Sequence, residues 1–272
     1  MDVSVASHHT QAGSCKLSSS SKRLYLLYHE LRTVPSTYSY AIEKSEFERH
    51  ADLFLQLRNS GSVVMWPEIT FDDGHLSNYE LALPVLASRE LRATFFITVG
   101  WTGKRDGYMG WDQVRGLQEN GQRIGAHGWT HTLLTHCDDA ALRTELDTAR
   151  LTLEDKLGIP VTSMSLPGGR FDRRVLTACR QAGYTQVYSS VPRAEEMPTA
   201  ALIGRLNIRN GQPVEWLAQL LNPHSDVLTR LERQEKWKSA LKATLGDGIY
   251  AKLWAVLNRQ EKDTGANEVP GR

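Results

Sequence analysis

The chain has 272 residues, of which 40% are hydrophobic and 23% are charged, with a mean hydropathy of -0.40. These values exclude collagen-like, coiled-coil and wholly disordered proteins and are typical of a soluble globular protein. Lysine and arginine total 32 against 31 acidic residues, a formal net charge of +1. The chain therefore has no overall basic charge that would predict a nucleic-acid partner.

Cysteine usage and the start of the chain indicate a compartment. The three cysteines are odd in number and far apart in sequence, so they predict no disulfide framework and are compatible with a reducing compartment. No apolar run is long enough to span a bilayer, and the first 22 residues lack the apolar core of a signal peptide. We therefore expect a cytoplasmic protein without a transmembrane segment.

Composition divides the chain into four segments. Residues 1–22 are polar and serine-rich and are expected to form a disordered leader, and residues 260–272 a disordered tail. Residues 23–211 alternate short apolar runs with helical periodicity, which is the pattern of repeated βα units in an α/β sheet or barrel. Residues 212–259 are predicted to form a helical C-terminal extension.

The predicted elements alternate along residues 23–211. Strands are expected at 24–28, 63–71, 93–97, 123–126, 161–166 and 187–188. Helices are expected at 77–88, 111–120, 138–157 and 173–183. Pro67 requires an edge or a bulge in its strand, and Pro84 is expected to kink its helix.

Polar and glycine residues follow three of these strands directly. They are Asp72, Asp73 and Gly74, then His127 with His131, and finally Pro167, Gly168 and Gly169. Because α/β folds place their sites at the carboxyl ends of parallel strands, we expect the three groups to meet. Aspartate and histidine are ligands of borderline divalent metals, and two imidazoles four residues apart can bind one ion.

The two adjacent aspartates suit two different roles. Neighbouring side chains at a strand end diverge, so one carboxylate can bind a metal while the other faces water, and Gly74 permits a sharp turn after them. A metal with open positions lowers the pKa of its water to about 7 and polarises a carbonyl. The residues therefore predict metal-dependent hydrolysis of an amide or ester. We expect one divalent ion per chain, Zn²⁺ first, with Co²⁺, Ni²⁺ and Fe²⁺ as alternatives.

Three motifs resemble the polysaccharide deacetylase family, also called the NodB-homology family or carbohydrate esterase family four. They are Thr-Phe-Asp-Asp-Gly at 70–74, Ala-Thr-Phe-Phe at 93–96 and the spacing of His127 and His131, and the resemblance covers residues 24–208. It implies a distorted (β/α) barrel in which Asp73, His127 and His131 hold the metal ion and Asp72 is the general base. The implied reaction removes an N-acetyl group from an amino sugar, with the oxyanion stabilised by the metal and a backbone N–H near Gly168.

Two parts of the family pattern are altered. Its third motif has arginine, any residue, proline, any residue and glycine, whereas residues 165–169 read Ser-Leu-Pro-Gly-Gly, with Arg170 just beyond. The guanidinium that orients the base is therefore missing from its usual place. The histidine that acts as general acid is not visible at 206–208. His29 and His224 are candidates for that acid, and His29 is favoured because a strand end would bring it to the same barrel face.

Trp129, residues 167–169 and residues 226–259 each allow two interpretations. Trp129, between the histidines, either stacks on a sugar or packs, and residues 167–169 form either a substrate-adjacent loop or a plain turn. Residues 226–259 carry seven basic and four acidic residues with Trp237 and Trp254 between them. This segment is either an amphipathic helix in peripheral contact with an anionic membrane or helices packed on the barrel.

We expect a metal-dependent N-deacetylase that acts on an oligosaccharide, a lipid-linked saccharide or a nucleotide sugar during surface-polysaccharide synthesis. Two alternatives remain open. One is a catalytically silent barrel that binds metal and a saccharide or a partner enzyme, although the intact Asp72 argues against it because a binding module needs no base. The other is a hydrolase of another small C–N (amide) substrate, which the missing acid motif leaves open. The sequence does not indicate an oligomeric state.

Overall fold

Eight short strands form the centre of the protein. The structure is a computed structural model, and it describes residues 22–60, 65–197, 199–222, 224–238 and 240. The strands are β1 (Lys22–Tyr28), β4 (Met65–Phe71), β5 (Ala93–Ile97), β6 (Arg123–Ala126), β7 (Ser163–Ser165), β8 (Gln186–Tyr188), β9 (Leu202–Ile203) and β10 (Arg205–Asn207). They hydrogen-bond in the order β10-β1-β4-β5-β6-β7-β8-β9, and every pair is parallel. All carboxyl ends therefore lie at one end of the sheet.

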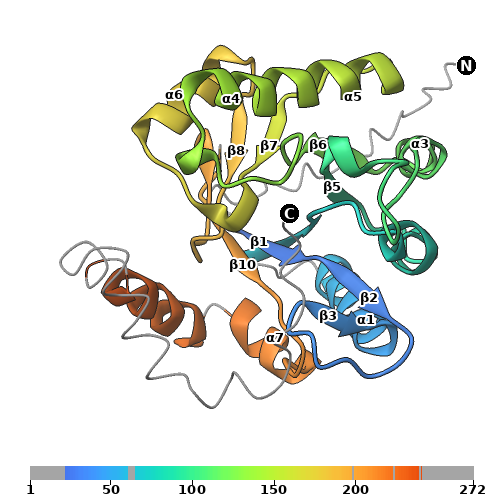
Figure 1. The fold of residues 1–272 in the computed structure, drawn as a ribbon. Helices are drawn as coiled ribbons and strands as arrows, with labels where there is room; N and C mark the ends of the chain where they lie inside the picture. The colour runs from blue at the N-terminus through green and yellow to red at the C-terminus, as the bar shows by residue number, and fades with distance from the viewer. Residues whose placement is uncertain (1–21, 61–64, 198, 223, 239, 241–272) are drawn as a thin grey trace, which may run out of the picture.

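A single run of residues closes this sheet into a barrel. β9 pairs with β8 at one edge and β10 pairs with β1 at the other, yet only Gly204 separates β9 from β10. Figure 1 shows β10 beside β1 at the centre of the molecule. Glycine is needed at the switch because a Cβ at Gly204 would lie 2.5 Å from the Val191 carbonyl oxygen. The expected α/β barrel is confirmed.

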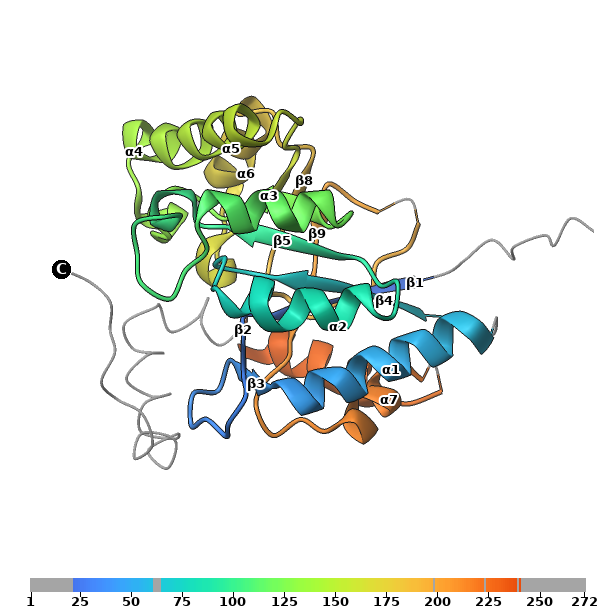
Figure 2. The same ribbon diagram turned by 90° about the vertical axis from the view of Figure 1, so that its right-hand side faces the viewer.

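Helices cover the outside of the barrel. They are α1 (Lys44–Ser60), α2 (Leu83–Ala87), α3 (Trp111–Glu119), α4 (Asp139–Arg143), α5 (Ala149–Leu157), α6 (Arg173–Gln181) and α7 (Val214–Leu221). Figure 1 shows α4, α5 and α6 on one side of the strands and α1 with α7 on the other, and Figure 2 shows α1 and α7 side by side. The core between helices and strands includes Phe71 and Phe95, which stack with ring centroids 5.0 Å apart.

The two long predicted helices each contain a π-helical segment. The helix expected at 138–157 begins at its cap Asp138, whose Oδ1 accepts the Ala141 N–H at 2.8 Å, and ends at Gly158 with φ of 66°. Between α4 and α5, residues Thr144–Thr148 are π-helical. The helix expected at 77–88 is π-helical over Asn78–Ala82 before α2 begins. Pro84 lies in the first turn of α2, where its missing N–H costs little.

Pro67 is accommodated inside β4 by the short length of its neighbour. Leu24 of β1 lies opposite Pro67, but β5 pairs with β4 only from Ile69 onward. Pro67 therefore has a strand on one side only, which is the edge position that its missing N–H requires.

A small second sheet at the carboxyl end of β1 was not predicted. β2 (Glu30–Arg32) and β3 (Ala41–Glu43) pair in parallel, and α1 follows β3 directly. These three-residue strands are too short to show a period in the sequence. Together they hold residues 33–40 at the end of the barrel where the other strands terminate.

The predicted chain ends fall mostly outside the described residues. Lys22 opens β1, whereas residues 1–21 of the expected leader, the tail 260–272 and residues 241–259 of the extension are not described. Residues 227–238 are helical, and apolar side chains from Val227 to Leu231 pack against the core. Within the described ranges, no helix combines the length and the apolar character needed to cross a bilayer.

Candidate active site

The functional side chains expected from the sequence meet where the parallel strands end. Asp72 and Asp73 follow β4, His127 follows β6, and Ser165 ends β7. The Asp72 amide donates to the Tyr28 carbonyl at 3.0 Å, and the His127 amide donates to Ile97 at 2.8 Å. Because these bonds continue the strand ladders, the backbone of both residues is fixed by the barrel itself.

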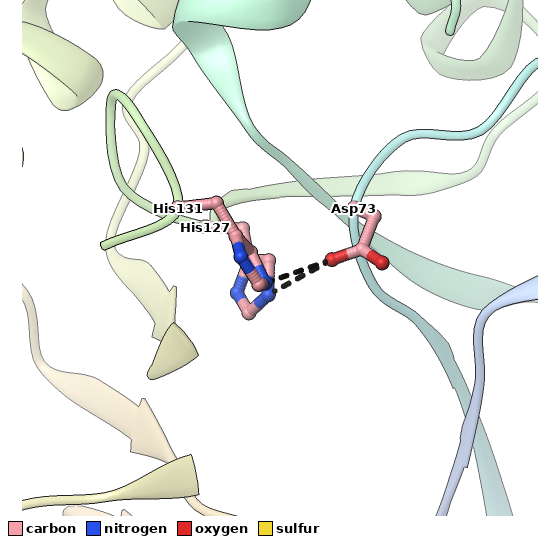
Figure 3. A group of neighbouring side chains, drawn as sticks. All are labelled: Asp73, His127 and His131. Atoms are coloured by element: carbon pink, nitrogen blue, oxygen red, sulfur yellow. Dashed lines mark ion pairs between the residues drawn. The ribbon is translucent and has the colours of Figure 1, made fainter. Parts of the chain in front are cut away.

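Asp73, His127 and His131 converge on one point (Figure 3). Asp73 Oδ1 lies 3.2 Å from Nε2 of His127 and 3.2 Å from Nε2 of His131. The two imidazole centroids are 4.9 Å apart, and one ligand atom from each residue lies within 4.8 Å of the others. The three side chains thus form a compact set of one carboxylate and two imidazoles, which we call the triad.

The protonation pattern of the triad fits a divalent cation. His127 Nδ1 lies 2.9 Å from the Ser165 carbonyl oxygen, which can only accept, so in the neutral ring Nδ1 carries the proton and Nε2 presents a lone pair. That lone pair faces Asp73 Oδ1, a buried oxygen without a hydrogen-bond partner among the described residues. A cation between two such acceptors removes their repulsion, and carboxylate and imidazole are ligands of zinc and related metals.

The surrounding charges make the triad an electronegative site. Burial by itself raises the pKa of Asp73, but the adjacent imidazoles of His127 and His131 outweigh it and hold this pKa well below its usual range. Burial by itself lowers the pKa of His127, but Asp72 and then Asp73 outweigh it and raise this pKa. Both shifts mean that positive charge is stabilised here, as a metal site requires.

Asp72 is held as an anion by a buried arginine. Arg205 donates through Nη1 to Oδ1 at 2.7 Å and through Nη2 to Oδ2 at 2.8 Å, and the Ser165 hydroxyl donates to Oδ2 at 2.8 Å. Burial alone raises the pKa of Asp72, but Arg205 and then His127 outweigh it and keep the pKa below its ordinary value. Oδ2 also lies 3.8 Å from His127 Nε2, so this fixed carboxylate borders the triad.

Arg205 corrects the expectation that the guanidinium orienting the base is missing. Arg170, which follows the altered motif, is exposed. Ser165 occupies the place of the family's arginine, and its hydroxyl oxygen accepts from Arg205 Nη2 at 2.7 Å. The arginine thus reaches Asp72 from β10 instead of β7, because barrel closure places β10 beside β1, whose other neighbour is β4. The signal in the sequence that could have revealed this role was Arg205 itself, a single charged residue in an otherwise apolar stretch.

A buried glutamate holds the loop that carries His131. Glu145 accepts from the Trp129 amide at 2.7 Å, from the Thr130 amide at 2.9 Å and from the Thr130 hydroxyl. His131 itself has a φ of 65°, the left-handed region that side chains disfavour. Glu145 lies in the π-helical segment Thr144–Thr148, and such segments are frequent at functional sites. Its three accepted bonds compensate for the strained loop.

His29 lies at the same end of the barrel. Its ring centroid is 4.7 Å from that of Tyr40, and its Nδ1 is buried without a hydrogen-bond partner among the described residues. Burial lowers the pKa of His29, although the charges of Asp73 and Asp72 act in the opposite direction. The other candidate, His224, is exposed beyond α7, and its described bond is from its backbone amide to Asn222.

The glycine-rich turn and Trp129 border the site. Pro167–Gly169 form one turn of 3-10 helix, in which Gly168 has a φ of 63°. Pro167 has no N–H, and the Gly169 amide donates to Leu166 at 2.8 Å, so Gly168 carries the amide that remains for a ligand. Trp129 is half-buried, with Lys104 Nζ 5.5 Å from its ring centroid.

Comparison with known proteins agrees with this geometry. Residues 60–187 match the family model for polysaccharide deacetylase. Among solved structures, the Streptococcus pyogenes deacetylase PplD, in complex with acetate, superposes with a TM-score of 0.65 at 17% identity, over 75% of this chain and 100% of that one. The polysaccharide deacetylase BC0361 of Bacillus cereus gives 0.65 at 20% identity, over 75% and 70%.

Through residues 60–187, a little less than half of its length, the chain is similar to the polysaccharide deacetylase family. YxkH of Bacillus subtilis (strain 168) is 25% identical over 187 residues, which are 62% of this chain and 64% of that protein. A chitin deacetylase of Pestalotiopsis sp is 27% identical over 123 residues, 45% of this chain and 41% of that protein. The chain thus spans less than two thirds of the length of either relative.

Replacing Arg205 with methionine should leave Asp72 as a buried carboxylate without its partner. We expect the free energy of unfolding to fall by about 3–5 kcal/mol in urea titrations, and Asp72→Asn should restore part of it in the double variant. Arg230→Met, which breaks an exposed pair with Asp226, should cost about 1 kcal/mol or less. Strictly additive effects of the two site substitutions would show that Arg205 does not act through Asp72.

Glu145→Gln should weaken metal binding, because an amide cannot accept from every donor of the His131 loop. We expect the zinc affinity, measured by chelator competition, to fall about 10- to 100-fold. Glu195→Gln is the matched control, since Glu195 is equally buried at 5% and accepts a backbone amide from Gly204 at 2.7 Å. Equal loss of zinc affinity in both variants would contradict a specific role for Glu145.

Proposed function

We propose that the protein is a metal-dependent hydrolase that removes an N-acetyl group from an amino sugar in a saccharide. The observation that carries this proposal is the triad of Asp73, His127 and His131 with the fixed carboxylate of Asp72 beside it. The match to the polysaccharide deacetylase family model supports deacetylation, and the name of the fungal chitin deacetylase supports a saccharide substrate. Zinc is the first candidate for the ion, followed by cobalt, nickel and iron.

In this proposal Asp73, His127 and His131 hold the ion. When bound, a divalent cation supplies Lewis-acid chemistry, lowering the pKa of water and polarising an amide carbonyl. Asp72 acts as general base and takes a proton from the attacking water on a carboxylate oxygen. Arg205 and Ser165 fix the carboxylate plane, and the depressed pKa of Asp72 keeps it ionised and ready to accept that proton.

His29 is proposed as the general acid that gives a proton to the leaving amine nitrogen. Its lowered pKa makes the protonated ring a stronger acid, and its unpartnered Nδ1 leaves a ring nitrogen without a competing protein contact. The Gly168 amide is proposed to stabilise the oxyanion, and Trp129 to border the sugar. The amide bond breaks, the water oxygen joins the acetyl carbon, and acetate and a free amine result.

The second candidate keeps the same machinery but hydrolyses another small amide. The buried Asp72 and its arginine favour either hydrolase over a silent barrel, because saccharide binding alone has no use for a fixed base beside a metal site. Release of acetate, compared with release of ammonia or a ring-opened product, distinguishes the two reactions. A lipid-linked or nucleotide-linked substrate, a role in surface-polysaccharide synthesis and a cytoplasmic location stay predictions.

The first test is acetate release from N-acetylated chitooligosaccharides by the zinc-loaded protein, with and without a chelator. We expect chelator-sensitive release, with about one metal per chain by elemental analysis. Asp73→Asn should lose metal and activity together, whereas Asp72→Asn should keep the metal and lose about 10²- to 10⁴-fold in kcat. Identical behaviour of the two variants would contradict the division of roles.

His29→Gln should reduce kcat by about 10²- to 10⁴-fold without loss of zinc, because it removes the proposed acid but no metal ligand. His136→Gln, at an exposed position, is the matched control and should keep the full rate. If His29→Gln retained the wild-type rate across the pH range, the acid would have to be another group.

A further inference from the structure

Three chain segments form the rim around the triad, and we call them the mouth. They are residues 36–40, 99–109 and 209–210. The Asn210 amide donates to the Ser39 carbonyl at 2.9 Å, which ties the first segment to the third. The Gly100 amide donates to Trp129 at 2.8 Å, and the Met109 amide donates to Gly74 at 3.0 Å. The mouth is therefore anchored to the loops that carry the triad.

Two series of aromatic rings lead outward from the triad through the mouth. On one side, Trp101 lies 5.1 Å from His131 and 4.7 Å from Tyr108, between ring centroids. On the other side, Tyr40 lies 4.7 Å from His29 and 5.7 Å from Tyr38, which is 52% exposed. Tyr40, Trp101 and Tyr108 are half-buried, and the parts of these rings that reach the surface, with exposed Tyr38, offer flat apolar faces on which sugar rings can stack.

Each side of the mouth also carries a cation placed over an aromatic ring. The Arg105 guanidinium carbon is 4.2 Å from the Trp101 centroid and 4.9 Å from that of Tyr108. The Arg209 guanidinium carbon is 5.6 Å from the Tyr40 centroid. With Lys104 over Trp129, three cations thus stack on rings of the mouth or of the loop that carries His131.

These cations have no acidic partner in the part of the chain that the structure describes. The side chains of Lys104, Arg105 and Arg209 form no ion pair and donate no hydrogen bond to a described residue, whereas thirteen other arginines and lysines outside the site form ion pairs with carboxylates. Asp106 is the single acidic residue within the three segments. A stacked guanidinium keeps its N–H donors free at its edge, where they match a carboxylate or phosphate.

We propose that the mouth selects an anionic saccharide, in which the N-acetylated sugar carries or adjoins a carboxylate or phosphate group. This inference rests on the proposed function of the triad as the deacetylation site. The aromatic rings hold the sugar faces, while Arg105 on one side and Arg209 on the other bind the negative group. A neutral chitin oligomer would fill the same rings but leave both guanidinium edges unpaired.

The test is saccharide binding by the zinc-loaded Asp72→Asn variant, which avoids turnover, measured by calorimetry at low and high salt. The first charged probe is a tetrasaccharide of alternating N-acetylglucosamine and glucuronic acid, and neutral chitotetraose is its reference. The second charged probe is UDP-N-acetylglucosamine, and the methyl glycoside of N-acetylglucosamine is its neutral reference. We expect at least one charged probe to bind about tenfold tighter than its neutral counterpart. The preference should shrink at high salt, and the two charged probes distinguish a carboxylate from a phosphate.

Substitutions show whether the rim cations cause the preference. Arg105→Gln and Arg209→Gln, introduced separately, should reduce the ratio of charged to neutral affinity several-fold, about the loss of one charge-assisted hydrogen bond each. Arg92→Gln is the control, because Arg92 is exposed and unpaired but precedes β5 at the opposite end of the barrel. Its ratio should equal that of the parent variant.

Equal affinity for charged and neutral probes, or no measurable affinity for any of them, would overturn the inference. Acetate release by the wild-type protein is measured in parallel on the same probes. Preferential binding of a charged probe without acetate release from any probe would contradict the proposed deacetylation but not the anionic mouth. Acetate release without a charge preference would contradict the mouth alone.

Discussion

The buried ion pair between Arg205 and Asp72 is the interaction on which the rest of the structure depends. The Arg205 side chain is fully buried, and its donors reach groups from β4, from the end of β7 and from the residue after β8. Its guanidinium also lies 5.3 Å from the Phe96 ring centroid and 5.7 Å from that of Tyr188. The hydrogen bonds that satisfy the buried charge of Arg205 therefore link strands across the closed barrel, and the same bonds fix the carboxylate of the proposed base.

Ser165 connects this pair to the triad. Its hydroxyl accepts a hydrogen bond from Arg205 and donates one to Asp72, while its carbonyl oxygen accepts a hydrogen bond from His127 Nδ1. The orientation of the proposed base and the tautomer of a proposed metal-binding imidazole thus depend on one residue at the end of β7. Because each partner is hydrogen-bonded, the buried charges avoid the cost that an unpaired carboxylate or imidazole would carry.

Beyond the strand ends, the site is built by loops held less regularly. His131 adopts a left-handed backbone conformation, and Glu145, from a π-helical segment, accepts the amides that precede it. The mouth is held to those loops by a few backbone hydrogen bonds and by stacked aromatic rings. The proposed chemistry therefore lies on the rigid barrel, whereas the proposed selection of the substrate falls to its rim, a common division in barrel proteins.

The sequence by itself determined the alternation of strands and helices, the strand-end positions of Asp72, Asp73 and His127, and the spacing that pairs His131 with His127. These features follow from local periodicity and from the rule that parallel strands end at one edge. Tertiary structure alone decided that Arg205 orients Asp72, that Glu145 holds the His131 loop, and that Arg209 lies over the Tyr40 ring. Those contacts join residues far apart in the chain, so they exist only once Gly204 lets one strand pair with both edges of the sheet and close the barrel.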